Sequence, residues 1–180
     1  ELAYNFIQNH NPNLIFLCNP NNPTGNYFSK SQIVTLLEKI KSASSILVLD
    51  EAYIDFVTDH QDLYDLVQKY KVILLRSLTK SYGITGLRLG YSLANAEITS
   101  QINQYIPPWS VNTLAQNAGI HLFSGNDHIQ TGKEIIDKSK NYLINALTDL
   151  GYTVEPSNAN FILVKVSSAK KMRDSLILRN

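Results

Sequence analysis

The stretch Ile46-Leu47-Val48-Leu49-Asp50-Glu51-Ala52-Tyr53 decides the fold class, because a short apolar run without polar alternation passes directly into polar side chains. A strand that is apolar on both faces is typical of a sheet covered on both sides, usually a parallel one. Three further runs, at 14–18, 72–75 and 161–164, have the same character. Residues 87–93 alternate more, which predicts an edge or antiparallel strand.

Helical patterns separate these strands. Ser29 with Gln32 three residues later forms a capping box, and the apolar side chains at 33, 36, 37 and 40 then recur on one face of a helix. Three further helices are expected, at 62–70, from the N-cap Asn112 through Leu122, and at 127–150 with Gly151 just after its end.

The order β-α-β-α-β-β, followed by helices and a later strand, predicts a three-layer α/β/α domain with a mostly parallel sheet. Residues 1–150 are expected to form a large domain, and residues 151–180 to begin a smaller one. The chain has no Met at position 1 and stops in the apolar run 176–178, so we expect a fragment of a longer protein.

Composition limits the class of protein. Hydrophobic residues make up 44% and charged residues 17% of 180 residues, which indicates a globular domain. A net charge of +1 without a run of Lys or Arg gives no reason to expect nucleic acid as a partner. Cys18 is the single cysteine, there is no apolar run of membrane length or signal peptide, and no His/Cys spacing indicates a metal site. A cytoplasmic protein is expected.

Polar side chains follow three of the apolar runs, at 19–25, 50–53 and 76–82. Ligands of open α/β sheets bind beyond the carboxyl ends of the strands. If these strands are parallel neighbours, their ends bring an amide, a carboxylate, a phenol, hydroxyls and an amine to one crevice. Arg88 follows Lys80 by eight residues.

These segments resemble the signature of the class I/II aminotransferases, enzymes of fold type I that use pyridoxal 5'-phosphate (PLP). Asn-Pro-Thr-Gly at 22–25 is weak evidence alone. Joined in order to Asp-x-x-Tyr at 50–53, Ser-x-x-Lys at 77–80 and Gly-Leu-Arg-x-Gly at 86–90, it is specific. The resemblance covers nearly the whole chain and implies PLP as cofactor, a small amino acid or phosphorylated amine as substrate, and a homodimeric full-length parent.

The resemblance also implies roles for individual residues. Lys80 would form the Schiff base with the cofactor aldehyde and then move protons at the substrate Cα. Asp50 would pair with the pyridine nitrogen and keep it protonated, so that the ring draws in electrons. Tyr53 and Asn22 would hydrogen-bond the phenolic oxygen of the ring.

The cofactor phosphate would be bound by Ser77, Thr79 and Arg88, the last through charge-assisted bonds. Each of these side chains, taken singly, has an ordinary structural explanation such as a turn, a cap or a surface ion pair. Their joint occurrence in this order favours the cofactor role.

The loop Pro-Pro-Trp-Ser-Val-Asn at 107–112 resembles that of L-threonine-O-3-phosphate decarboxylases, lyases of cobalamin synthesis, and this is our first expectation for the function. The alternative is a histidinol-phosphate aminotransferase of histidine synthesis, a transferase whose similar loop usually lacks Pro-Pro-Trp. A non-catalytic fragment or binding module is the alternative of another class.

Trp109 and Asn112 are candidate substrate-binding residues, or parts of a rigid connector in which Asn112 caps the next helix. Asn160 lies in 158–161, a segment that resembles the start of the small domain's sheet, and either approaches the site or forms a turn. The resemblance places the substrate-carboxylate Arg beyond Asn180, and the phosphate-binding turn and a Tyr donated across the dimer upstream of Glu1.

Overall fold

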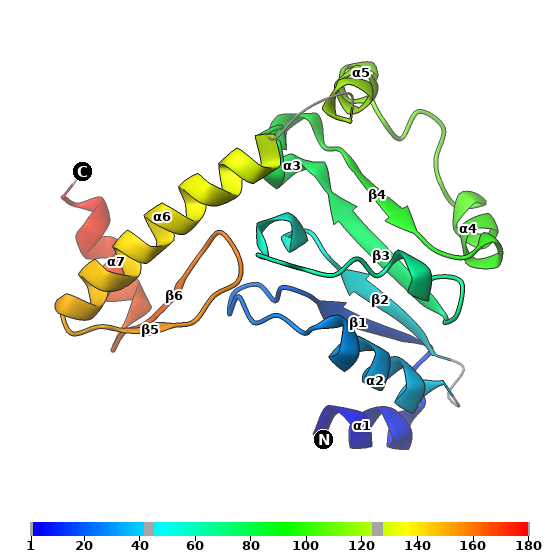
Figure 1. Ribbon diagram of the computed structural model, residues 1–180, viewed down its shortest axis with the longest axis horizontal. Coiled ribbons are helices and arrows are strands. Elements are labelled where there is room, and N and C mark those ends of the chain that lie inside the picture. The colour runs from blue at the N-terminus through cyan, green and yellow to red at the C-terminus, as the bar shows by residue number, and fades with distance from the viewer. Residues whose placement is uncertain (1, 42–44, 124–127, 180) are drawn as a thin grey trace.

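A four-stranded mixed sheet forms the centre of the computed structural model, which describes residues 2–41, 45–123 and 128–179 (Figure 1). The strand order is β1-β2-β3-β4, and β1 to β3 are parallel whereas β4 is antiparallel to β3. This confirms the mostly parallel sheet and the antiparallel edge strand. The four strands are β1 (Leu14–Cys18), β2 (Ile46–Asp50), β3 (Val72–Ser77) and β4 (Gly90–Leu93).

Helices pack on both faces of this sheet or extend away from it. The helices are α1 (Leu2–His10), α2 (Lys30–Ile40), α3 (Leu78–Ser81), α4 (Ala96–Asn103), α5 (Thr113–Leu122), α6 (His128–Asp149) and α7 (Ala169–Ile177). Three 3-10 turns cover Ile54–Phe56, Tyr64–Leu66 and Thr85–Leu87. None of the described helices is long and apolar enough to cross a membrane.

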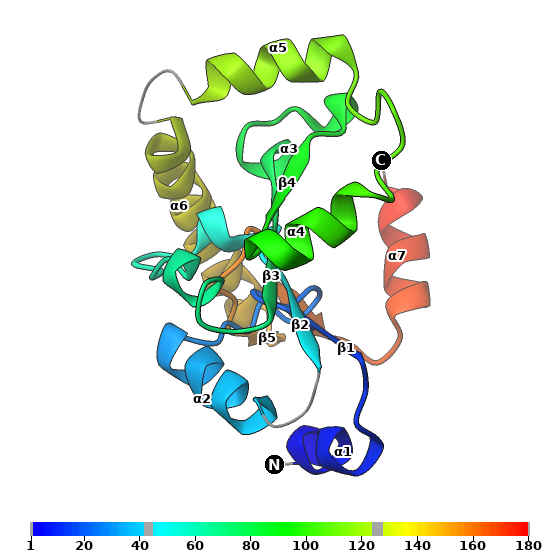
Figure 2. The ribbon, with the colours of Figure 1, turned by 90° about the vertical axis from the view of Figure 1, so that its right-hand side faces the viewer.

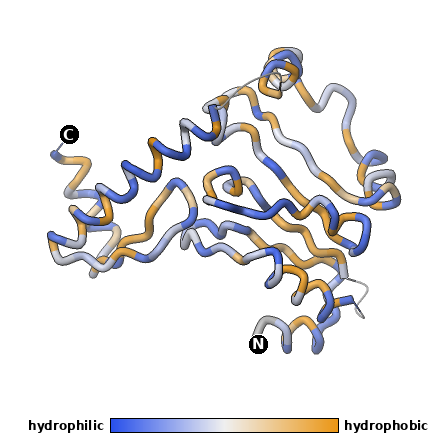
Figure 3. The backbone as a smooth tube through the Cα atoms, in the orientation of Figure 1, coloured by the Kyte–Doolittle hydropathy of each residue, from blue (hydrophilic) through white to orange (hydrophobic). Residues whose placement is uncertain are grey.

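The two faces of the sheet are covered unequally. On one face Ile7 of α1 and Ile33 of α2 pack in one cluster with Leu47 and Leu49 of β2, while on the other Ile98 of α4 packs with neighbouring strand residues. Hydrophobic segments accordingly follow the strands (Figure 3). Phe16 of β1 nevertheless remains 72% exposed. The expectation that every apolar strand is covered on both faces is therefore wrong for β1.

The capping box predicted at the start of α2 is confirmed. The Ser29 hydroxyl accepts from the Gln32 amide at 3.4 Å, and the Gln32 side chain accepts from the Ser29 amide at 2.8 Å. Asn112 is the N-cap of α5, as expected, and its side chain accepts from the Ala115 amide.

The prediction of a helix at 62–70 is wrong, because the structure has only the 3-10 turn Tyr64–Leu66 there. Leu66 is buried in the main core, and its carbonyl accepts from the amides of both Lys69 and Tyr70. Lys30 of α2 holds the start of the segment by donating to the Asp62 carbonyl at 3.0 Å. Two tertiary contacts, the core packing of Leu66 and the bond from Lys30, thus hold the segment in a form other than a regular helix.

The long helix α6 leads from the sheet to a second, two-stranded antiparallel sheet formed by β5 (Thr153–Glu155) and β6 (Leu163–Lys165) (Figure 1). Gly151 has φ +84° after the helix end, and the Tyr152 amide donates back to the Leu147 carbonyl, as in a Schellman motif. The role expected for Gly151 is thus confirmed, whereas residue 127 of the expected helix lies outside the described residues. A domain boundary near residue 150 stays a prediction.

The chain end and α5 lie apart from the main core. Two views at right angles place α5 at the opposite end of the molecule from α1 (Figure 1, Figure 2). Several apolar side chains of α5 and α6 are exposed, including Ile120 at 69% and Tyr142 at 72%.

Candidate active site

The polar segments that follow β1, β2 and β3 lie side by side at one edge of the sheet. Backbone hydrogen bonds continue past the strand ends, from the Asn19 amide to the Asp50 carbonyl at 2.8 Å and from the Glu51 amide to the Leu75 carbonyl at 2.9 Å. The convergence expected from parallel neighbouring strands is therefore present.

Lys80 lies beside the aromatic ring that follows β2. Its Nζ is 5.6 Å from the centroid of the Tyr53 ring and donates to the Ser77 hydroxyl at 3.1 Å. The Tyr53 hydroxyl accepts from the Asn22 side-chain amide at 3.2 Å. Four residues from three separate strand ends are thus joined in one chain of contacts.

The hydroxyls before Lys80 form a pair at the start of α3. Ser77 is the N-cap residue of this short helix, and its Oγ lies 2.8 Å from Thr79 Oγ1. Thr79 is buried, while Lys80 is only half-buried. Two hydroxyls and an amine within one turn make a compact set of donors.

Asp50 and Arg88 make local contacts. Asp50 accepts from the Ala52 amide at 3.0 Å, and its side chain is half-buried at the end of β2. Arg88 has a left-handed backbone with φ +59°, and within the described residues its guanidinium donates to the Thr85 carbonyl at 3.0 Å. Arg88 is therefore near the hydroxyl pair in sequence but is bound to its own loop.

The three residues considered for substrate binding are placed differently. Trp109 is 96% exposed. Asn112 caps α5 by accepting from the Ala115 amide at 2.9 Å, and donates to the Leu87 carbonyl at 3.1 Å. Asn160 is exposed in the turn before β6. These contacts give Asn112 the connector role, and the structure brings none of the three into the contacts described around Lys80.

Sequence reasoning missed a contact from the segment that connects β5 to β6. The Phe161 ring meets the Tyr53 ring edge-on, with centroids 5.1 Å apart. The Asn158 amide donates to the Gly25 carbonyl at 2.9 Å. The resemblance of segment 158–161 was the one available signal, but no local pattern indicates which residues it touches.

Gly25 is the tightest point of this contact. It has φ +72°, and a Cβ added there would lie 2.0 Å from Ser157 Oγ and 2.8 Å from Ser157 Cα. Only glycine fits both the backbone conformation and the space.

We expect Gly25→Ala to lower the free energy of unfolding by about 2–4 kcal/mol, since strain at positive φ adds to overpacking. Gly83 is a matched control, because it has φ +66° with no atom within 4 Å of an added Cβ. Urea unfolding of Gly83→Ala should show only the backbone cost, about 1 kcal/mol. Equal losses in the two variants would contradict the close contact with Ser157.

Comparison with known proteins decides the family. The profile of the family "Aminotransferase class I and II" matches residues 1–179. The chain belongs to the class I/II aminotransferases. This family consists of PLP-dependent enzymes, so the expected enzyme class and the expected cofactor are confirmed at the level of the family.

Two curated relatives show how far the likeness of this class I/II aminotransferase extends. A histidinol-phosphate aminotransferase of Flavobacterium johnsoniae is 37% identical over 169 residues, which cover 93% of this chain and 48% of that protein. Histidinol-phosphate aminotransferase 2 of Carboxydothermus hydrogenoformans is 35% identical, covering 87% and 44%. The chain thus spans about half the length of the curated relatives it matches.

Solved structures agree on the fold. The histidinol-phosphate aminotransferase of Clostridium acetobutylicum superimposes with a TM-score of 0.88 at 26% identity, covering 98% of this chain and 55% of that one. The L-threonine-O-3-phosphate decarboxylase of Porphyromonas gingivalis gives 0.80 at 28% identity, covering 89% and 49%.

Proposed function

We propose that this class I/II aminotransferase binds PLP at the sheet edge around Lys80 and transfers the amino group of histidinol phosphate to a keto acid. The observation that carries the proposal is the chain of contacts from Lys80 to Ser77 and, across the Tyr53 ring, to Asn22. It joins the amine to the groups expected to bind a hydroxylated ring.

The side chains at this edge fit PLP in kind. Asp50 offers a carboxylate for a ring nitrogen, and the Tyr53–Asn22 pair offers donors for a phenolic oxygen. The Ser77 and Thr79 hydroxyls would hold the phosphate, and the Arg88 guanidinium would join them on leaving the Thr85 carbonyl. PLP, when bound, supplies an electron sink for the bond broken at the substrate Cα.

The residues of this chain would then orient the cofactor ring and move the proton at the substrate Cα. Lys80 supplies an amine whose Nζ is already held by a hydrogen bond, so that it can take a proton from Cα and return one. Asp50, as an anion, favours a proton on the ring nitrogen. The T-shaped contact with the Phe161 ring would fix the orientation of Tyr53.

The choice of histidinol phosphate rests on the relatives named above, two histidinol-phosphate aminotransferases at 35% and 37% identity. It replaces the decarboxylase as our first choice. L-Threonine-O-3-phosphate decarboxylase remains a second candidate because of the Pro-Pro-Trp loop at 107–109 and the structural likeness to the Porphyromonas gingivalis enzyme. We further propose that the full-length enzyme is a homodimer.

The reaction is tested by incubating the purified protein and PLP with histidinol phosphate and a keto acid. We expect the amino acid that corresponds to the keto acid to form, and no carbon dioxide to be released from phosphothreonine. Carbon dioxide release would support the second candidate instead. Activity confined to unphosphorylated amino acids would contradict both.

A further inference from the structure

A buried ion pair lies behind the candidate site. Arg76 Nε donates to Glu51 Oε2 at 2.7 Å, and the two side chains are only 7% and 1% exposed. Glu51 directly follows Asp50, and Arg76 directly precedes Ser77. Because successive side chains of a strand alternate between its faces, this pair joins the ends of β2 and β3 on the face opposite to Asp50 and Ser77.

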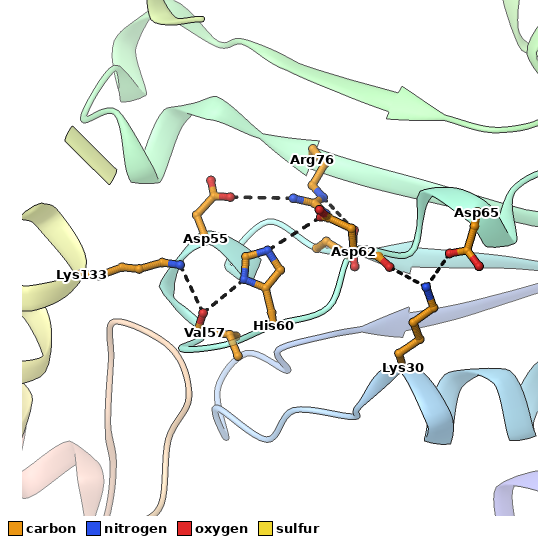
Figure 4. A network of polar contacts seen from close by, with 9 residues as sticks. Lys30, Asp55, Val57, His60, Asp62, Asp65, Arg76 and Lys133 are labelled. Atoms are coloured by element: carbon orange, nitrogen blue, oxygen red, sulfur yellow. Dashed lines mark hydrogen bonds and ion pairs between the residues drawn. The ribbon is translucent and has the colours of Figure 1, made fainter. Parts of the chain in front are cut away.

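The same guanidinium holds the loop that follows Tyr53. Arg76 Nη1 lies 3.8 Å from Asp55 and Nη2 lies 3.6 Å from Asp62 (Figure 4). With Glu51, one cation faces three carboxylates. The Tyr64 ring covers the guanidinium at 5.4 Å.

The loop is also fastened to α6. Lys133 of α6 donates to the Val57 carbonyl at 3.3 Å, and the His60 ring contacts the same carbonyl at 3.2 Å (Figure 4). The segment after Tyr53 therefore lies between the β3 side chain Arg76 and the helix that leads to the second sheet.

A general need for stability does not explain this pair. Burial raises the pKa of Glu51, and Arg76 opposes that rise. Replacing a buried ion pair with well-packed apolar side chains is often neutral or stabilising. A charge-assisted hydrogen bond is directional, whereas apolar packing is not. The bond can therefore fix the end of one strand relative to the end of the other.

We propose that Arg76 and Glu51 are positioning residues that hold the ends of β2 and β3 so that Asp50 and Lys80 face the same cofactor. This inference rests on the proposed PLP site. The hydrogen bond and ion pairs described for the two side chains do not include Asp50, Tyr53 or Lys80, so each would act through its neighbour in the chain.

Three variants distinguish a role in positioning the strand ends from a role in the stability of the fold. Glu51→Gln keeps an oxygen that accepts from Arg76 Nε, Glu51→Leu removes it, and the double variant Glu51→Leu/Arg76→Leu also removes the unpaired cation. Asp65→Asn is the control, because it breaks the exposed Lys30–Asp65 pair of 2.6 Å. PLP dissociation constants are measured well below each unfolding temperature, and amide hydrogen exchange of peptides 49–53 and 75–80 is followed without PLP.

We expect PLP affinity to be nearly unchanged in Glu51→Gln and Asp65→Asn, and about tenfold or more weaker in Glu51→Leu. The two peptides should exchange about tenfold faster in Glu51→Leu. The double variant should regain thermal stability and keep both the weak PLP binding and the fast exchange.

The proposal would be overturned if the double variant regained PLP affinity and slow amide exchange together with its thermal stability. It would also be overturned if Glu51→Leu matched the wild type in PLP affinity and amide exchange. If the wild-type protein binds no PLP, the proposed function fails. The exchange rates of the two strand ends then still decide whether the pair holds them.

Discussion

Lys80→Ala is expected to abolish the visible absorption band that PLP gives with the wild-type protein. Lys80 is the amine that the structure holds between the Ser77 hydroxyl and the Tyr53 ring. Alanine removes the nucleophile that would bind the cofactor aldehyde. Borohydride reduction followed by peptide mass spectrometry should find the cofactor on Lys80 in the wild type and none in the variant.

Lys69→Ala is the matched control, since Lys69 is an exposed lysine 3.4 Å from Asp65 and precedes the start of β3, whereas Lys80 follows its end. Its spectrum should equal that of the wild type. A visible band of full intensity in Lys80→Ala would refute the assignment of Lys80, whatever the substrate is.

Arg76→Met is expected to cause the largest loss of stability, about 3–5 kcal/mol, because it leaves the buried Glu51 without its partner. Urea unfolding at neutral pH measures this loss. Asp65→Asn should change stability by no more than about 1 kcal/mol, since exposed pairs contribute little.

The loss in Arg76→Met should depend on pH in a definite direction. Burial raises the pKa of Glu51, and the variant loses the guanidinium that lowers it. A carboxyl whose pKa is higher in the folded state contributes stability below its unfolded pKa and loses it as the pH rises through the folded pKa. The difference from wild type should therefore shrink as the pH falls towards the ordinary pKa of a Glu. A difference that stays constant would show that lost packing, rather than charge, destabilises the variant.

The sequence predicts the central sheet well because its signals are local. The run Ile46–Asp50 becomes the inner strand β2, and the Ser29–Gln32 capping box begins α2. The polar ends of three strands meet because parallel neighbours end at the same edge, which requires only the strand order.

Other features depend on contacts that no local pattern encodes. The 62–70 segment has helical spacing, but core contacts of Leu66 and the bond from Lys30 to Asp62 hold it in a different form. The partner of Arg76 is 25 residues away, and Phe161 contacts Tyr53 from the connection between β5 and β6. Pairings at this distance follow from the tertiary fold.

The contact between Asn158 and Gly25 has a consequence for synthesis of the chain on the ribosome. These residues are 133 positions apart, so the loop 19–25 cannot make its final contact until the ribosome has added the intervening segment. At a rate of about 5–20 residues per second, that interval is roughly 7–27 s. During this time β1 can already pair with β2. The Gly25 carbonyl has no Asn158 to bind, because residue 158 has not yet been translated.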